Sequence, residues 1–252
     1  MLRGVRPLVV LPTYNEAANV DRVLRLVRAS LPEATVLVVD DGSPDGTAEL
    51  AEKTGTDVGG VEVLRRDSKS GLGSAYRAGF RWGLAHGFDA CIEMDADLSH
   101  DPGALPGLLS PLDSGYDLVV GSRYVPGGSI PNWQRSRFLL SRGGNLYADV
   151  VLGLHVTDST SGFRAYRADM LRQIDLSRVR ADGYGFQIEM CYEVIRHGGR
   201  VSEVPIRFVD RVEGESKMSS HIVVEALALV TWWGVLRLWE PLRRRWRPSP
   251  SR

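Results

Sequence analysis

The sequence predicts an α/β fold in which a mostly parallel central sheet is flanked by helices. Over the first hundred residues, short apolar runs alternate with segments whose apolar residues recur at helical spacing. Such alternation is typical of parallel strands joined by right-handed helical crossovers. The chain has 252 residues, of which 43% are hydrophobic and 25% charged, so it can form one large domain with a substantial core.

Each element of the first half has its own signal. Residues 7–16 form an apolar run that is too short for a helix and ends at a turn, which predicts a buried strand. Residues 15–33 predict a helix, because one helical face carries Val20, Val23, Leu24, Val27 and Leu31. The same alternation then predicts a strand and loop at 34–47, a helix at 44–55, a strand at 61–66, a helix behind a glycine turn at 71–87, and a strand at 89–97.

The second half is less regular. It contains strand-like runs at 116–124 and 200–210 and a helical pattern at 137–153. Its longest apolar run, residues 222–236, has 15 residues, whereas a helix that crosses a bilayer needs roughly 20. We therefore expect no transmembrane helix. We divide the chain into a domain at 1–220, an amphipathic helix at 221–246 that lies on a membrane or docks on a partner, and a disordered tail at 247–252.

Composition narrows the function classes. The formal net charge is zero, so the bulk charge does not predict nucleic acid as a partner. Cys91 and Cys191 lie far apart, which indicates packing roles and a reducing cytosol rather than a metal or redox pair. The motif at 71–73 is Gly-Leu-Gly, but Tyr76 stands where a dinucleotide fingerprint needs its third glycine. The sequence therefore argues against a nicotinamide-dependent oxidoreductase.

Acidic residues gather where predicted strands end. Asp40 and Asp41 close the second strand, and Asp95 and Asp97 follow the fourth. Because parallel strands present their carboxyl ends at one edge of the sheet, these acids are expected to share a ligand site. Alternate residues of a strand point the same way, so Asp95 and Asp97 are expected to face one ion, and hard carboxylate oxygens suit Mg²⁺ or Mn²⁺. Glu93 points to the same side but lies deeper, as a supporting residue.

Several basic residues stand in polar settings in the second half and, as a set, are expected to bind phosphates: Arg123, Arg137, Arg164, Arg211 and Lys217. His100 follows the acidic pair, and we expect it to support the site or to pack rather than to act in catalysis.

Together these stretches resemble the family 2 glycosyltransferases of the GT-A fold, and more narrowly the dolichol- or polyprenol-phosphate mannose synthases. The resemblance runs in order from residue 8 to about residue 217. It is carried by "LPTYNE", "DDGSPDGT", "GLGSAYRAG", "MDADLSHDP", "GSRY", "RFLLSRGGN", "DSTSGFRAYR", "GYGFQIEM" and "VPIRFVDRVEGESK". The combination of "DDGSPDGT" with "FVDRVEGESK" is its most specific part.

The resemblance implies a role for each matching residue. The guanine and ribose of GDP-mannose would be held by Pro12, Tyr14, Glu16, Val39 and Asp41. The diphosphate and metal would be surrounded by Asp95, Ala96 and Asp97, with Ser99 or a water as a further metal ligand. The acceptor phosphate would be held by Arg123, Arg137 and Ser141, and the donor would be covered by Arg211 and Lys217. The implied catalytic residues are Asp97, Arg123, Arg137 and Ser141, and Arg123 also counts with the donor site.

The implied reaction needs no general base, because the phosphate of the lipid acceptor is already anionic. Its oxygen attacks the anomeric carbon opposite GDP and gives a polyprenyl β-mannosyl phosphate. A lipid acceptor implies that the enzyme lies peripherally on the cytoplasmic face of a membrane. A membrane-embedded protein partner is compatible with this location. Two alternatives stay open: a UDP-sugar-dependent glucosyl- or aminosugar-transferase, and a non-catalytic nucleotide-binding membrane adaptor.

Overall fold

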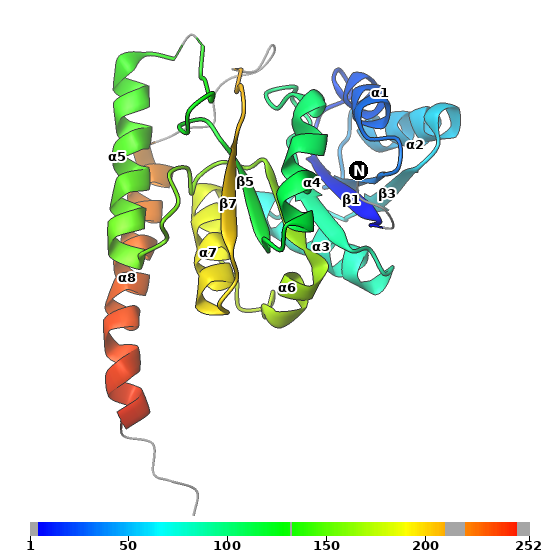
Figure 1. The fold of residues 1–252 in the computed structure, drawn as a ribbon. Coiled ribbons are helices and arrows are strands. Elements are labelled where there is room, and N and C mark those ends of the chain that lie inside the picture. The colour runs from blue at the N-terminus through cyan, green and yellow to red at the C-terminus, as the bar shows by residue number, and fades with distance from the viewer. Residues whose placement is uncertain (1–4, 132, 210–219, 246–252) are drawn as a thin grey trace, which may run out of the picture.

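The fold is built on a seven-stranded sheet with the strand order β3-β2-β1-β4-β6-β5-β7. The computed structural model describes residues 5–131, 133–209 and 220–245 (Figure 1). The strands are β1 Pro7–Thr13, β2 Thr35–Asp40, β3 Val61–Arg65, β4 Ala90–Glu93, β5 Leu118–Ser122, β6 Arg164–Arg167 and β7 Val201–Pro205.

The sheet is mostly parallel, which confirms the predicted fold class. Strands β1 to β4 run parallel to one another, and β5 runs parallel to β7. Only β6 is antiparallel to its two neighbours, β4 and β5. Because β1 lies between β2 and β4, the carboxyl ends of these three strands lie next to each other at one edge.

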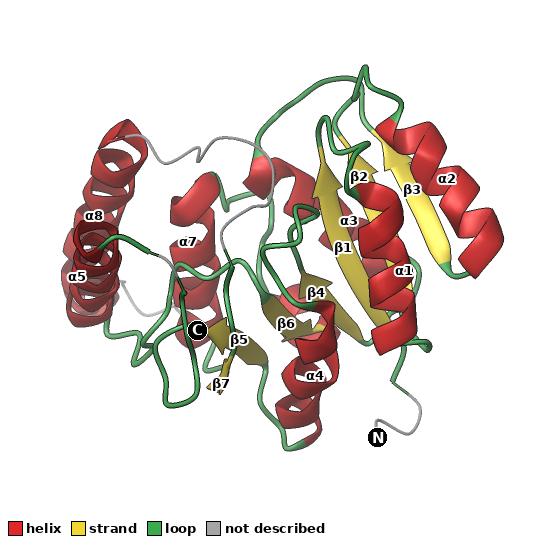
Figure 2. Cartoon of the chain, turned by 90° about the horizontal axis from the view of Figure 1, so that it is seen from above, coloured by secondary structure: helices red, strands yellow, loops and turns green. Residues whose placement is uncertain are grey.

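Helices cover both faces of the sheet (Figure 2). They are α1 Val20–Ser30, α2 Thr47–Val58, α3 Leu72–Ala85, α4 Leu105–Asp113, α5 Arg135–Leu152, α6 Ala168–Gln173, α7 Gly183–Arg196 and α8 Ser220–Arg245, with a short 3-10 turn, η1, at Pro102–Ala104. Alternate residues of β1 enter different cores. Leu8 and Val10 pack with α3 and α7, whereas Val9 and Leu11 pack with α1 and α4. A strand that is buried on both faces explains the continuous apolar run in the sequence.

Helices α5 and α8 lie side by side at one end of the sheet (Figures 1 and 2). One side of α8 packs against the rest of the protein, because Val230 is buried and Gly234 lies against Val151. The bounds of α8 agree with the predicted helix to within one residue, and the predicted tail at 247–252 lies outside the described residues. Among the helices that are described, none combines the length and the apolar character that a bilayer crossing requires.

Both cysteines are buried and unpaired, as their spacing predicts. Burial raises the pKa of Cys91 to about 12 and that of Cys191 to about 11. Thiols with such pKa values stay protonated at neutral pH, so their role is packing.

Candidate active site

A cleft opens at the carboxyl ends of β1, β2 and β4, where the acidic clusters were predicted to meet. Its volume is about 870 Å³, open solvent included. The residues that line it are Pro12, Thr13, Tyr14, Glu16, Asp41, Lys69, Gly71, Leu72, Ala75, Asp95, Ala96, Asp97 and Asp182. Of the residues expected to bind the donor, the cleft therefore brings together Pro12, Tyr14, Glu16, Asp41, Asp95, Ala96 and Asp97.

The segment from Asp95 to Ser99 folds into a tight turn just after β4. Leu98 has a φ of +63°, a left-handed conformation that a leucine rarely adopts. The turn brings the backbone N–H of Ser99 within 3.0 Å of Asp97 Oδ1, to which it donates a hydrogen bond. Asp97 is 6% exposed, whereas the side chain of Asp95 is 28% exposed and faces the cleft. Strained backbone of this kind commonly occurs where side chains are held for a ligand.

The residues of this turn fit a divalent metal ion. Asp95 and Asp97 supply carboxylate oxygens, and Ser99 Oγ is buried without a hydrogen-bond partner among the described residues. Hard oxygen donors are the ligands that Mg²⁺ and Mn²⁺ prefer. Within the described part of the chain no three His, Cys, Asp or Glu residues gather to form a complete metal site. This donor set therefore suits an ion that takes its remaining ligands from water and a bound diphosphate.

Two side chains outside the turn hold Asp95 in place. The hydroxyl of Tyr76, on α3, donates to Asp95 Oδ1 at 3.3 Å. Burial and the negative charge of Asp95 raise the pKa of Tyr76 well above its ordinary value, so the hydroxyl stays a donor. On the other side, the backbone N–H of Asp95 donates to Nδ1 of His100 at 3.2 Å. His100 is buried and stacks on Phe163, and burial lowers its pKa, so the ring is a neutral acceptor as its supporting role requires.

Glu93 lies beneath this site at the end of β4 and is completely buried. Burial raises the pKa of Glu93 to about 7, while the charge of Arg164 acts in the opposite direction. Like Arg164, the nearby Gln187 and Tyr166 side chains act to lower this pKa, although neither forms a hydrogen bond of good geometry with the carboxyl group. Glu93 is therefore a supporting residue behind the turn and not part of the cleft.

The side of the cleft formed by β1 and β2 has a different chemistry. Asp41 accepts hydrogen bonds from Arg66 Nη1 at 2.8 Å and from the backbone N–H of Ser70 at 3.1 Å, which fixes its carboxylate. Lys69 Nζ lies 4.4 Å from the centre of the Tyr14 ring and brings a positive charge to an otherwise acidic cleft. Val39 was expected here, but its side chain is fully buried in the core on β2, so only its backbone lies near the cleft.

Asp182, on the loop before α7, closes the cleft opposite β1. Its Oδ1 accepts a hydrogen bond from the backbone N–H of Gly73 at 2.6 Å and so caps the start of α3. Its other oxygen lies directly over Gly71, so any side chain at position 71 would collide with it. Gly71 also has a φ of +89°, which favours glycine independently. The glycine motif thus serves a helix cap rather than a dinucleotide site.

A second cavity, of about 580 Å³ with open solvent included, lies between α5, α7 and α8. Most of its wall is apolar, and its polar groups gather around Arg123. It is lined by Arg123, Trp133, Leu140, Ser141, Gly144, Thr160, Tyr184, Ile188, Ala226, Leu227 and Val230. The Phe208 ring contacts both His100, next to the acidic turn, and Trp133, in the wall of this cavity, with centroid distances of 5.6 and 6.0 Å.

Of the residues expected to bind the acceptor, Arg123 and Ser141 line this second cavity, and Arg137 lies next to it against Trp133. Ser141 Oγ accepts a hydrogen bond from the Tyr124 hydroxyl at 2.7 Å, and the Arg137 guanidinium lies 4.0 Å from the centre of the Trp133 ring. Arg123 is only 7% exposed and forms an ion pair with the fully buried Asp158 at 2.6 Å. Burial lowers the pKa of Arg123, but the Asp158 carboxylate outweighs burial and raises it above its usual value.

Arg164 does not belong to this set, and its expected role in phosphate binding is wrong. Its guanidinium is fully buried and donates to the backbone carbonyls of Ser159, Ser161 and Gln187. All of these bonds are internal, so Arg164 holds the 159–161 loop against α7. Arg211 and Lys217, which were expected to cover the donor, lie outside the described residues.

Comparison with known proteins identifies the family. The model of the family described as "Glycosyl transferase family 2" matches residues 8–175, more than half of the chain. The chain belongs to this family. Two curated proteins are similar over nearly the whole chain. An undecaprenyl-phosphate mannosyltransferase of Micrococcus luteus is 52% identical and covers 96% of this chain and 99% of its own. A polyprenol monophosphomannose synthase of Mycolicibacterium smegmatis is 48% identical, with coverage of 91% and 87%.

Solved structures show the same fold. Glucosyl-3-phosphoglycerate synthase of Mycobacterium tuberculosis, in complex with Mn²⁺, UDP-glucose and phosphoglyceric acid, matches with a TM-score of 0.70 at 21% identity. The match covers 92% of this chain and 81% of that one. The same enzyme with UDP alone matches with a TM-score of 0.69. At this level of identity the likeness concerns the fold, which is the α/β fold of family 2 that the sequence predicts.

Proposed function

We propose that the chain transfers mannose from GDP-mannose to the phosphate of a polyprenyl phosphate, with inversion at the anomeric carbon. The observation that carries this proposal is the pairing of two unlike cavities. The acidic cleft has the oxygen chemistry for a sugar diphosphate and its metal ion, and the second, mostly apolar cavity has the Arg123 guanidinium in its wall. Mannose transfer to a polyprenyl phosphate agrees with the activities of the two curated relatives, each about half identical to this chain.

Asp95, Asp97 and Ser99 would hold Mg²⁺ or Mn²⁺. When bound, such an ion offsets the negative charge that develops on the departing diphosphate. The protein keeps this end of the cleft acidic and rigid, through the hydrogen bonds to Asp95 from Tyr76 and to Asp97 from Ser99. On the opposite side of the cleft, Tyr14, Glu16 and Asp41 line the space for the nucleoside.

The acceptor needs binding rather than deprotonation. Its phosphate is anionic at neutral pH, so the protein has to bring two negatively charged substrates together. Arg123 and Ser141 provide a cationic and a hydroxyl group in the wall of the second cavity, and Arg137 adds a cation beside it, against Trp133. His100, the histidine closest to the acidic turn, accepts a backbone hydrogen bond and is neutral. This arrangement suits a reaction without a general base.

The face formed by α5 and α8 would rest on the cytoplasmic surface of a membrane. Leu139, Leu146 and Val150 lie on one side of α5 and are 67, 64 and 73% exposed, and Trp232 on α8 is 60% exposed. Exposed apolar side chains in such a group favour a lipid surface, where tryptophan lies at the headgroup level. The sequence from Arg237 onward carries six Arg against one Glu, which favours anionic lipids.

Replacing Leu146 with serine is expected to weaken binding to vesicles that contain anionic lipids by about fivefold, because the serine variant loses roughly 1 kcal/mol of apolar burial. Leu26→Ser is the matched control, since Leu26 is a 38% exposed leucine on α1, away from the proposed face. Co-sedimentation with vesicles measures both variants. Equal binding of Leu146→Ser and the unchanged protein would rule out this face as the contact, and would favour docking on a protein partner.

The donor is tested by transfer of radiolabel into lipid. Purified protein is incubated with polyprenyl phosphate, Mg²⁺ and labelled GDP-mannose, UDP-glucose or a UDP-aminosugar in parallel reactions. Label is expected in the lipid fraction with GDP-mannose and not with the UDP-sugars. Product from a UDP-sugar alone would overturn the proposed donor, and absence of product from every donor would favour a non-catalytic role.

A further inference from the structure

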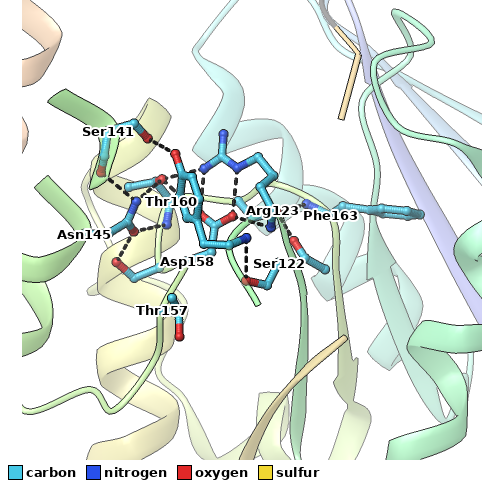
Figure 3. A network of polar contacts seen from close by, with 12 residues as sticks. Ser122, Arg123, Ser141, Asn145, Thr157, Asp158, Thr160 and Phe163 are labelled. Carbon is cyan, nitrogen blue, oxygen red and sulfur yellow. Dashed lines mark hydrogen bonds and ion pairs between the residues drawn. The ribbon is translucent and has the colours of Figure 1, made fainter. Parts of the chain in front are cut away.

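A buried polar network joins three segments of the chain around the second cavity (Figure 3). The segments are the end of β5, the middle of α5, and the 157–161 loop. The network includes Arg123 and Ser141, two of the three residues expected to contact the acceptor phosphate. Its remaining members, chiefly Thr160, Asn145 and Asp158, have no role in the expected site.

The network fixes the orientation of the Arg123 guanidinium. Nε donates to Asp158 Oδ2 at 2.7 Å, and Nη2 donates to Asp158 Oδ1 at 2.6 Å and to Thr160 Oγ1 at 2.8 Å. These bonds use one edge of the guanidinium, and Nη1 has no bond to the other residues drawn in Figure 3. Arg123 also lines the second cavity, so the orientation set by Asp158 and Thr160 decides which N–H groups an acceptor meets there.

Thr160 connects this ion pair to α5. Its hydroxyl oxygen accepts one hydrogen bond from Arg123 and a second from Asn145 Nδ2 at 3.1 Å. Its own proton points to Asp158 Oδ1 at 3.4 Å. A hydroxyl group offers one donor and two acceptor positions, so Thr160 uses its full capacity inside the protein.

Asn145 extends the connection to Ser141. This residue is 2% exposed and donates from Nδ2 to the backbone carbonyl of Ser141 at 2.9 Å. Its Oδ1 accepts from Ser159 Oγ at 3.0 Å and from the backbone N–H of Thr160 at 3.2 Å. Because a backbone N–H can only donate, the bond from Thr160 assigns the amide oxygen and nitrogen without ambiguity.

The two ends of the network are anchored elsewhere in the fold. Glu203, on β7, accepts hydrogen bonds from the backbone N–H groups of Thr157 and Asp158 at 2.8 and 3.0 Å and holds the loop to the sheet. Ser141 Oγ accepts a hydrogen bond from Tyr124, the neighbour of Arg123 on the chain. Arg123 and Ser141 are therefore tied together twice, once through Thr160 and Asn145 and once through Tyr124.

We propose that Thr160 and Asn145 are positioning residues, which hold Arg123 and Ser141 in the one arrangement that receives the acceptor phosphate. This inference rests on the proposed acceptor site. Groups that are fixed before the substrate arrives bind an anion without reorganising during the reaction. Thr160 is the residue to change, because its hydroxyl is the only link through which Asn145 reaches the Arg123 side chain in the bonds described above.

The test compares Thr160→Val, which keeps the shape but lacks the hydroxyl, with Thr160→Ser, which keeps the hydroxyl. Steady-state kinetics give kcat and KM for polyprenyl phosphate and, separately, for GDP-mannose. Thr160→Val is expected to lower kcat/KM for polyprenyl phosphate at least tenfold. Because Arg123 lines the second cavity and not the acidic cleft, the KM for GDP-mannose is expected to stay within twofold. Thr160→Ser is expected to recover most of the lost efficiency. A role in stability alone would lower Tm and affect both substrates alike, which would overturn the inference.

Ser141→Ala, measured in parallel, tests the proposed acceptor site separately from the positioning role of Thr160. An unchanged acceptor KM in Ser141→Ala would show that the proposed acceptor site itself is wrong. A raised acceptor KM in Ser141→Ala together with unchanged kinetics in Thr160→Val would leave the acceptor site standing and overturn only the positioning role. If Thr160→Val does not yield folded protein, Thr160→Ala takes its place with the same expected acceptor-specific loss.

Discussion

Replacing Asp97 with asparagine is expected to lower mannosyl transfer by about 10³-fold or more. Asparagine has almost the same shape, so it retains a carbonyl oxygen that can accept the hydrogen bond from the Ser99 N–H. Asparagine lacks the negative charge with which Asp97, a side chain that is only 6% exposed, would bind a divalent ion. The fold should persist while the metal and the sugar diphosphate lose their main anchor.

The matched control for Asp97→Asn is Asp101→Asn. Asp101 lies four residues further along the same loop, is exposed, and accepts a hydrogen bond from the Gly103 N–H at 2.9 Å as a helix cap. Asparagine caps helices about as well as aspartate, so Asp101→Asn should keep nearly full activity. Transfer rates at saturating Mg²⁺, together with Mn²⁺ titrations, measure the difference. Full activity in Asp97→Asn would show that the metal site is wrongly assigned.

Replacing Asp158 with asparagine is expected to lower the free energy of unfolding by about 3–5 kcal/mol. Asp158 is fully buried and its two carboxylate oxygens face the Arg123 guanidinium at 2.6 and 2.7 Å. Arginine side chains stay charged in folded proteins. Removing the partner of Arg123 therefore leaves an uncompensated charge in the interior. The loss reflects that unpaired charge rather than the strength of the ion pair.

Urea denaturation of Asp158→Asn and of Asp169→Asn provides the comparison. Asp169 pairs with Arg172 at 2.6 Å, but the two side chains are 72 and 48% exposed. An exposed ion pair of this kind contributes about 0–1 kcal/mol, so Asp169→Asn should change stability little. Equal effects of the two substitutions would mean that Arg123 is not buried as the structure describes.

The regular part of the fold follows from patterns that lie within a few residues of each other. Residues 7–12 are apolar at every position because β1 is covered on both faces, and the spacing of Val20, Val23 and Val27 matches the buried side of α1. Helices α4, α6 and α7 are not predicted. Pro111 lies inside α4, and α7 begins with Gly183, so the local preferences oppose the helices that tertiary packing stabilises.

The acidic half of the site is predictable because strand ends converge wherever parallel strands are neighbours. That rule alone is enough to place three acids in one cleft, namely Asp41, Asp95 and Asp97. Their partners could not be foreseen in the same way. Tyr76 reaches Asp95 from another element, and Asp182 reaches Gly73 across 109 residues of sequence. Such contacts depend on how helices pack on the sheet, and no local pattern records them.

The basic half shows the same limit. As isolated residues in polar motifs, Arg123 and Arg164 look alike, yet Arg164 is enclosed by backbone carbonyls while Arg123 lines a cavity. What separates them is the identity of their acceptors, which come from distant loops. The resemblance to mannose synthases places Arg123, Arg137 and Ser141 together, and the structure adds that Thr160 and Asn145 connect two of them.

The most direct measurement of the central claim is the anomeric configuration of the lipid product formed from GDP-mannose, read from the one-bond carbon–hydrogen coupling of the anomeric centre. Attack by the acceptor phosphate from the side opposite the departing diphosphate predicts a β-linked mannosyl phosphate. An α-linked product would contradict direct transfer between two cavities on opposite sides of the sugar.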